Sequence, residues 1–191
     1  MANPLFDSLF GKHAGKSQVF LHLPDGQTIT YADFLRMAAQ YAGALTKFGL
    51  VPGDRLAVQI AKSPQALAVY AACAQAGVIF LPLNTAYTPE EVSYFVENSG
   101  ARLVLCDQSK HAGMVPVAKA CGAELATMNA DGSGTFADVA ATMPDSFATV
   151  DRSLDDLAAF LYTSGTTGRS KGAMLTQGNL LSNAQTLVAE W

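Results

Sequence analysis

The order of apolar and polar positions divides the chain into segments with helical spacing and short runs that are apolar at every position. After Thr30 and Asp33, which approximate a capping box, apolar residues recur at helical spacing until Gly49. The continuous apolar runs are typical of strands buried on both faces of a sheet. These patterns predict helices over 30–49, from Thr88 onward, over 110–120 and over 136–142, and strands over 55–60, 102–106 and 123–127.

The longest uncharged stretch, residues 63–89, has two interpretations. Its apolar part, 66–83, is long enough for a membrane-spanning helix. However, Ser63-Pro64 supplies an N-cap followed by proline at the first helical position, and Gly77 interrupts the run as a helix stop. The residues after Gly77 are β-branched and aromatic, as in strands. We therefore predict a buried helix that ends at Gly77 and a buried strand that follows it.

Strands alternate with helices along the chain. This alternation predicts an α/β fold, with a mainly parallel sheet and helices on both faces. Residues 143–156 form a connection rich in aspartate. We expect a boundary there between a first α/β subdomain, 1–150, and the start of a second subdomain, 151–191.

Composition and charge exclude several classes of protein. Hydrophobic residues make up 50% of the chain and charged residues 15%, so a disordered or fibrous chain is excluded. The 12 cations and 16 anions give a net charge of −4, and no basic face indicates a nucleic-acid binder. The 3 cysteines lack a paired spacing, so we expect no disulfide framework and a cytoplasmic location. We also expect neither a secretory signal nor a membrane partner.

The stretch with the clearest chemistry is 157–172. The apolar run Leu157–Tyr162 predicts a buried strand that leads into the sequence TSGTTGRSKG. Glycines let backbone amides approach a ligand closely, and hydroxyls with successive amides form an anion-binding concavity. Arg169 and Lys171 lie in this segment, although the last third of the chain is otherwise acidic. The pattern predicts a phosphate-binding loop in which Lys171 acts as a point charge.

Two other kinds of loop are excluded by spacing. A Walker A loop needs four residues between its glycines and Ser or Thr after its lysine, whereas here Gly168 follows Gly165 too closely and Lys171 precedes Gly172. A nucleophile elbow is excluded because Ser164 lacks the flanking glycines. A plain surface loop would match these positions by chance on the order of 10⁻⁹ per starting point.

The segment YTSGTTGRSKG resembles the phosphate-loop signature of the adenylate-forming superfamily, which comprises acyl- and aryl-CoA synthetases, luciferases and the adenylation domains of peptide synthetases. Upstream blocks resemble the same enzymes: Gly53-Asp54-Arg55, residues 77–87 (GVIFLPLNTAY) and Thr88-Pro89-Glu90-Glu91. Residues 81–87, 155–159 and Arg169-Ser170 are most similar to malonyl-CoA synthetases. The resemblance covers nearly all of the chain.

This resemblance implies a two-step ligase with ATP, Mg²⁺ and coenzyme A. A carboxylate, with malonate favoured, attacks the α-phosphate of ATP and releases pyrophosphate, and the thiol of coenzyme A then attacks the acyl-adenylate. Lys171 is the implied catalytic residue, and Thr163 is the implied metal ligand. The implied nucleotide-binding residues are Thr163, Ser164, Gly165, Thr166, Thr167, Gly168 and Lys171.

The family pattern continues beyond Trp191, with further nucleotide-binding segments, the acyl pocket and a C-terminal domain. We therefore expect this chain to be the N-terminal part of such an enzyme and to be inactive by itself. The strand 157–162 would then belong to a second sheet whose other strands are missing, and its unpaired apolar edge would favour self-association. Other acyl or aryl acids, a carrier-protein adenylation domain and a non-catalytic nucleotide-binding fragment remain alternatives.

Other reactive residues have plainer interpretations. Cys106 and His111 could be imagined as a nucleophile and its base, but a buried, inert cysteine is the better interpretation. The histidines lack metal-ligand spacing. Asp155 and Asp156 are expected to lie in a solvated connection and not to form a catalytic acid pair.

Overall fold

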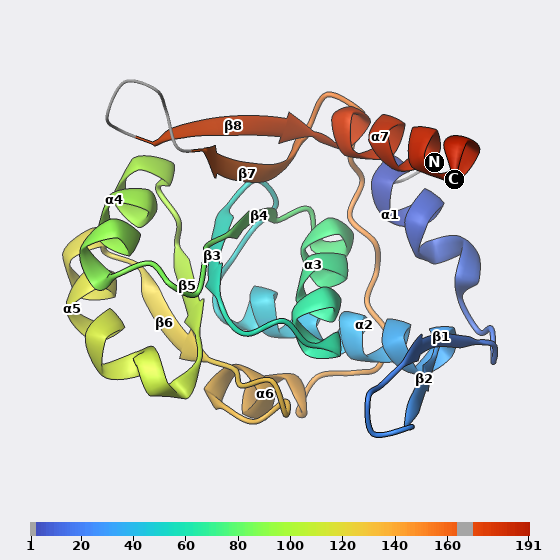
Figure 1. Ribbon diagram of the computed structural model, residues 1–191, viewed down its shortest axis with the longest axis horizontal. Helices are drawn as coiled ribbons and strands as arrows, with labels where there is room; N and C mark the ends of the chain where they lie inside the picture. The colour runs from blue at the N-terminus through green and yellow to red at the C-terminus, as the bar shows by residue number, and fades with distance from the viewer. Residues whose placement is uncertain (1–2, 164–169) are drawn as a thin grey trace.

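A six-stranded sheet organises the molecule, in the computed structural model that describes residues 3–163 and 170–191 (Figure 1). The strand order is β6-β5-β3-β4-β7-β8, and every neighbouring pair is parallel except β7 and β8, which are antiparallel. This confirms the predicted mainly parallel α/β fold. The strands are β3 (Arg55–Gln59), β4 (Ile79–Pro82), β5 (Leu103–Cys106), β6 (Glu124–Thr127), β7 (Leu157–Thr163) and β8 (Lys171–Thr176).

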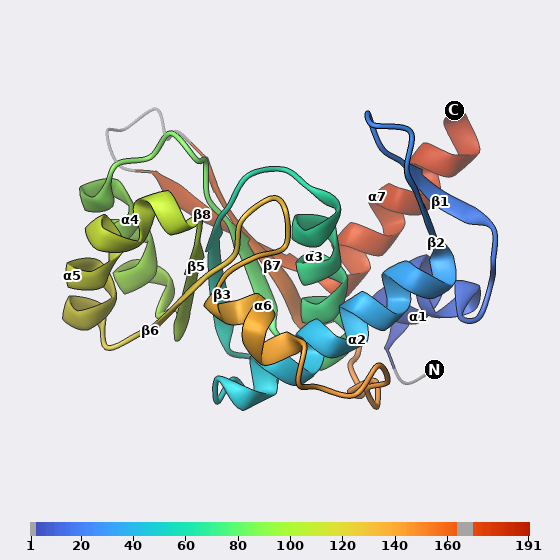
Figure 2. The same ribbon diagram turned by 90° about the horizontal axis from the view of Figure 1, so that it is seen from below.

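Helices cover both faces of this sheet, as Figures 1 and 2 show from two sides. Along β3, Leu56 and Val58 face a core formed with α1, α2, α3 and α6, whereas Ala57 faces a second core formed with α4 and α5. Because both faces are covered, the strands are apolar at consecutive positions. The helices are α1 (Pro4–Leu9), α2 (Tyr31–Lys47), α3 (Pro64–Ala76), α4 (Pro89–Ser99), α5 (His111–Cys121), α6 (Thr135–Ala140) and α7 (Gln177–Glu190), with 3₁₀ turns at Gly11–His13 and Gln108–Lys110.

The uncharged stretch forms the predicted helix and strand. The Ser63 hydroxyl accepts a hydrogen bond from the amide of Ala66 at 3.1 Å, which caps α3. Gly77 ends α3 with a φ of 69°, a conformation that favours glycine, and β4 follows. Within the described parts of the chain, no helix combines the length and the apolar character needed to cross a bilayer.

Helix α4 begins as its sequence predicts. The Thr88 hydroxyl accepts from the amide of Glu91 at 3.3 Å, and the Glu91 carboxylate accepts from the amide of Thr88 at 2.8 Å, which together form a capping box. Pro89 occupies the first helical position. The helix is therefore fixed at its start, and it lies beside the end of β7 and β8 where the two strands are joined (Figure 1).

The expectation of a second sheet at 157–162 is wrong. β7 pairs in parallel with β4, where Ala159 is opposite Phe80, and in antiparallel with β8. The edge strand at this side of the sheet is therefore β8 and not β7, and Met174 on β8 is 61% exposed. The pairing of β4 with β7 joins residues far apart in sequence, so no local pattern predicts it. The division of the chain into 1–150 and 151–191 stays a prediction.

Two peripheral regions were not predicted. Strands β1 (Val19–His22) and β2 (Thr28–Thr30) form an antiparallel hairpin, and Gly26 in its turn has a φ of 84°. The sequence Pro-Asp-Gly at 24–26 is a turn signal that could have revealed it. Helices α1 and α7 contact each other, and the buried side chain of Gln177 on α7 accepts from the amide of Leu5 at 3.2 Å.

Candidate functional site

The β7–β8 hairpin carries the two predicted phosphate-binding residues that the structure describes. Thr163 is the last residue of β7, Lys171 is the first residue of β8, and the two are register partners. The Thr163 hydroxyl donates to the carbonyl of Lys171 at 3.4 Å. Both residues are exposed, as a site for a soluble anion requires. The predicted residues Ser164, Gly165, Thr166, Thr167 and Gly168, and Arg169, lie outside the described residues.

The hairpin end lies at the carboxyl-terminal edge of the parallel strands. In open α/β sheets, ligands bind outside this edge. A cavity of about 750 Å³ lies at the same edge, against the ends of β3 and β4, and Lys62 lies in its lining. Sequence reasoning did not single out Lys62, although a lysine that follows a buried strand end is a usable signal. Among the described residues, the cavity is also lined by Val58, Ile60, Ala61, Ala66, Phe80, Pro82, Leu83, Asn84 and Thr85.

A buried glutamine shapes the loop beside this cavity. Gln59, the last residue of β3, is fully buried, and its amide nitrogen donates to the carbonyls of Asn84 and Tyr87 at 2.9 Å each. Hydrogen bonds from one side chain to two carbonyls hold the segment between β4 and α4 in one conformation. The block at 77–87 that carries the family resemblance is thus fixed from inside the sheet.

Helix α4 contacts both stems of the hairpin. The Tyr162 hydroxyl on β7 donates to the Asn98 side-chain oxygen at 2.6 Å, and the Tyr94 hydroxyl donates to the carbonyl of Ser170 at 3.0 Å. The rings of Tyr162 and Phe95 lie 4.5 Å apart between centroids. Burial, with a smaller contribution from Tyr94, raises the pKa of Tyr162. Sequence reasoning identified none of these contacts.

Gly172 has a packing role in this hairpin. It lies opposite Tyr162 in the β7–β8 ladder. A Cβ atom on Gly172 would lie 3.3 Å from the Tyr162 ring, closer than most Cβ contacts allow. The glycine after Lys171 therefore makes room for the ring that α4 holds, and it does not need an unusual backbone conformation.

The other candidate chemistries are not supported. Cys106 is fully buried, and burial raises its pKa to about 11, so the buried and inert interpretation holds. Among the residues described, no group of three or more His, Cys, Asp or Glu side chains could hold a metal ion. Asp156 accepts from the amide of Ser153 at 2.7 Å and lies near Arg152, which is a structural role in the connection before β7.

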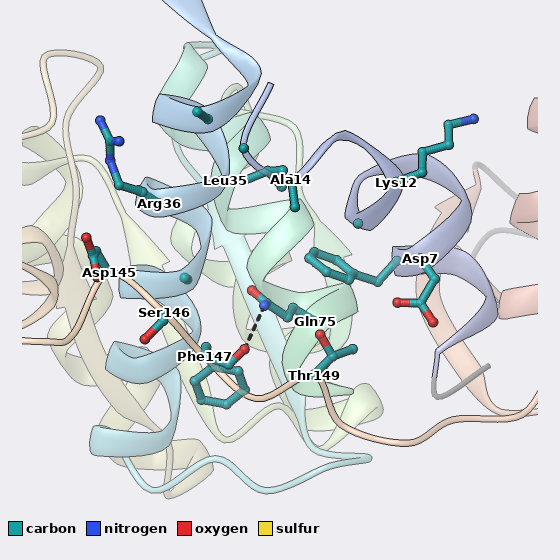
Figure 3. Close-up of a pocket in the computed structure, with 15 residues that line it drawn as sticks. Asp7, Lys12, Ala14, Leu35, Arg36, Gln75, Asp145, Ser146, Phe147 and Thr149 are labelled. Atoms are coloured by element: carbon teal, nitrogen blue, oxygen red, sulfur yellow. Dashed lines mark hydrogen bonds between the residues drawn. The ribbon is translucent and has the colours of Figure 1, made fainter. Parts of the chain in front are cut away.

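A second cavity, of about 700 Å³, lies away from the hairpin, between α1, α2 and the connection that precedes β7 (Figure 3). Its apolar lining includes Phe6, Leu35 and Phe147. The Gln75 amide nitrogen donates to the carbonyl of Phe147 at 3.1 Å, which ties the connection to α3. Neither Thr163 nor Lys171, the two phosphate-binding candidates that the structure describes, lines this cavity. The candidate site is therefore the hairpin edge.

Comparison with known proteins identifies the family of this chain. The sequence profile of the family described as "AMP-binding enzyme" matches residues 10–191. The chain belongs to the AMP-binding enzyme family. Because the match extends through both β7 and β8, the AMP-binding domain includes the hairpin and the helix α4 that holds it.

Solved structures and curated relatives agree on the family and differ in substrate. Apo MatB from Rhodopseudomonas palustris is 46% identical, with a TM-score of 0.94 over 99% of this chain and 38% of that chain, and an ATP-bound form matches equally well. A feruloyl-CoA synthase from Amycolatopsis sp is 38% identical over 86% of this chain and 32% of the relative. The fatty acid–[acyl-carrier-protein] ligase ScoC from Streptomyces coeruleorubidus is 33% identical over 88% of this chain and 32% of the relative. This chain thus spans about a third of the length of these proteins.

Proposed function

We propose that this AMP-binding domain belongs to an ATP-dependent carboxylate–CoA ligase of the malonyl-CoA synthetase type. One observation carries the proposal: the 46% identity and TM-score of 0.94 to MatB, a malonyl-CoA synthetase whose structure has been solved with ATP. The relatives named for ferulate and for fatty acids make those acids the alternatives. The expected compartment is the cytoplasm.

The proposed reaction has two steps. A carboxylate oxygen forms a bond to the α-phosphorus of ATP, and the bond to the pyrophosphate oxygen breaks. The sulfur of coenzyme A then bonds to the acyl carbon as AMP leaves with the bonding electrons, and the thiol proton is released. The first step gathers negative charge on the departing phosphates, so a catalyst acts mainly by positioning them and by stabilising that charge.

Lys171 and Thr163 are the described residues suited to this task. The Lys171 ammonium supplies a positive charge and three donors for phosphate oxygens. The Thr163 hydroxyl, now 3.4 Å from the Lys171 carbonyl, is a weakly engaged donor that can turn toward an anion. The predicted cradle formed by Ser164, Gly165, Thr166, Thr167 and Gly168 stays a prediction.

The described residues fit Mg²⁺ only if the ion is bound mainly by the phosphates of the nucleotide. Magnesium prefers carboxylate, water and phosphate oxygens. Thr163 offers a single hydroxyl, and no cluster of acidic side chains accompanies it in the described parts of the chain. Bound Mg²⁺ would neutralise phosphate charge, and Thr163 would contribute at most one ligand. Coenzyme A is proposed as the second substrate.

The test is carboxylate-dependent exchange of labelled pyrophosphate into ATP. It is run on this chain and on the protein encoded by the natural reading frame if that frame continues past Trp191. Malonate, methylmalonate, acetate, ferulate and a medium-chain fatty acid are compared. In a longer protein we expect exchange with malonate. In the chain of 191 residues we expect ATP binding without exchange.

Each result bears on one part of the proposal. Exchange with ferulate or the fatty acid, and none with malonate, would replace the substrate class and keep the reaction. Exchange by this chain alone would overturn the expectation that it is inactive by itself. If calorimetry on folded protein detects no ATP binding, with or without Mg²⁺, the phosphate-binding role of the hairpin is wrong.

The expected self-association also stays a proposal, now attached to a different strand. β8 is one of the two edge strands of the sheet, with Met174 61% exposed and no strand on its outer side in the described structure. Exposed edges with apolar residues pair readily with other chains. Sedimentation of the chain at several concentrations tests this.

A further inference from the structure

Two polar residues of α4 hold the hairpin at positions next to the phosphate-binding candidates. Asn98 accepts a hydrogen bond from Tyr162, the residue directly before Thr163. Tyr94 donates to the carbonyl of Ser170, the residue directly before Lys171. Thr163 and Lys171 therefore each come directly after a residue that is hydrogen-bonded to α4.

The spacing of Tyr94 and Asn98 on α4 allows both contacts at once. Tyr94 and Asn98 are four residues apart, so they lie on the same face of the helix, one turn from each other. The capping box at Thr88 and Glu91 fixes the start of this helix, and Phe95 packs into the core beneath it. The hairpin is thus anchored to an element that is itself anchored to the sheet.

The sheet alone does not hold the end of the hairpin. β7 is in register with β4 at Ala159 and Phe80, and β4 ends at Pro82. Continuing this register places Tyr162 and Thr163 beyond the last residue of β4. On its other side β7 pairs with β8, which is an edge strand of the sheet. Figures 1 and 2 place α4 beside this end of the two strands.

We propose that Tyr94 and Asn98 are positioning residues, which fix Lys171 and Thr163 in the arrangement that binds the phosphates of ATP. The inference rests on the proposed function, because it assigns Lys171 and Thr163 to phosphate. It extends that function to two residues that lie far from the loop in sequence and act through Ser170 and Tyr162. A preset lysine loses less freedom on binding, so it gains affinity without any new contact to the nucleotide.

The first test compares tyrosine variants that lose only a hydroxyl. Calorimetry with Mg·ATP is run on wild-type chain, Tyr94→Phe and the control Tyr31→Phe. Tyr31 stacks on His13 at the other end of the molecule, and its hydroxyl has no hydrogen-bond partner in the described structure. We expect the affinity for Mg·ATP to be about three- to tenfold weaker in Tyr94→Phe, because this is the usual effect of losing one hydrogen bond. We expect no change in Tyr31→Phe.

The Asn98 contact allows a rescue experiment. Asn98→Leu removes the acceptor for Tyr162 and should weaken ATP binding by a similar factor. Asn98→Asp keeps an acceptor oxygen and should restore most of the affinity, although it adds a negative charge near the site. Equal losses in both variants would show that the hydrogen bond is not what matters.

A double-mutant cycle separates positioning from general stabilisation. If Tyr94 acts through Lys171, Tyr94→Phe should have little further effect on ATP affinity in a Lys171→Ala background. A structural role elsewhere would leave the two losses additive. In a longer, active protein the same substitution should raise the KM for ATP and leave the KM for the carboxylate unchanged.

A measurement without nucleotide distinguishes failure of this inference from failure of the proposed function. Hydrogen exchange is followed on peptides that contain 170–172 and on β3. In Tyr94→Phe we expect faster exchange at 170–172 and unchanged exchange in β3. Unchanged exchange at both would overturn the anchoring by α4. Absence of ATP binding by the wild-type chain, with the exchange difference present, would overturn the phosphate role and leave the anchoring intact.

Discussion

The middle strands of the sheet are buried along nearly their whole length, whereas the β7–β8 hairpin is exposed toward its end. β3 lies between β4 and β5, and its Leu56 is fully buried, as are Leu103 and Leu105 on β5. In the hairpin, Leu161 is 38% exposed and Met174 61% exposed. Burial of apolar area is the main source of folding free energy, so stability is concentrated in the middle strands.

The difference indicates where chemistry can be accommodated. A ligand-binding loop needs exposed polar groups and freedom to adapt, and these features contribute little to folding. The hairpin places the exposed residues Thr163 and Lys171 at the edge of the sheet, and α4 holds the residues directly before them through hydrogen bonds. Substitutions in the middle of the sheet should therefore affect folding, whereas substitutions at the hairpin should affect binding.

Leu56→Ala should have the largest effect on stability. The side chain is fully buried between two strands and the helices of one core, so truncation leaves a cavity. We expect a loss of about 2–5 kcal/mol in the free energy of unfolding, measured by urea titration. ATP affinity per folded molecule should be unchanged. A loss of affinity as large as that of a hairpin variant, in fully folded Leu56→Ala, would contradict the division of roles.

Lys171→Ala should show the reverse pattern. Lys171 is exposed at the start of β8, so its removal should change the free energy of unfolding by no more than about 0.5 kcal/mol. Loss of a charged donor to phosphate should weaken Mg·ATP binding by about tenfold or more. Calorimetry and urea titration on the same sample give both values.

Lys12→Ala is the matched control for Lys171→Ala. Lys12 lies in the 3₁₀ turn after α1, away from the hairpin, so its removal should leave ATP affinity unchanged. Equal fractional losses of stability and binding in Lys171→Ala would mean that the lysine supports the fold and not the ligand.

Much of this contrast could be predicted from sequence because its causes are local. The cap at Ser63 and the stop at Gly77 define α3 through neighbours only a few residues away. The loop at 163–172 was identified by hydroxyl, glycine and lysine residues that lie together in the chain. Its two described candidates, Thr163 and Lys171, do end up as partners across one ladder.

The features that could not be predicted from the sequence depend on contacts between distant segments. The pairing of Phe80 with Ala159 decides whether β7 starts a new sheet or extends the first one, and an apolar run is compatible with both. Helical spacing shows that Tyr94 and Asn98 share a face, but it does not say which segment that face meets. The hairpin anchor was therefore outside the reach of sequence patterns, and it became visible only once α4 and β7 were placed in space.

Asp156→Asn should have the smallest effect, at the junction between the two regions. The Asp156 carboxylate accepts from the amide of Ser153, and its carbonyl accepts from the amide of Gln177, so this residue links the connection before β7 to α7. The hydrogen bond from Ser153, with a smaller contribution from Arg152, holds the pKa of Asp156 below its ordinary value. A lowered pKa in the folded state means that the charged form stabilises the fold above the ordinary pKa, and that this stabilisation is lost as pH falls through the lowered value.

Urea titrations at pH 7, 5 and 3 should therefore show Asp156→Asn slightly less stable than wild type at pH 7 and 5, with the difference in the free energy of unfolding closing toward pH 3. Asp155→Asn, at an exposed neighbour without a hydrogen bond or ion pair in the described structure, should show no such gap. A gap for Asp156→Asn that persists unchanged at pH 3 would mean that the carboxylate charge does not stabilise this junction.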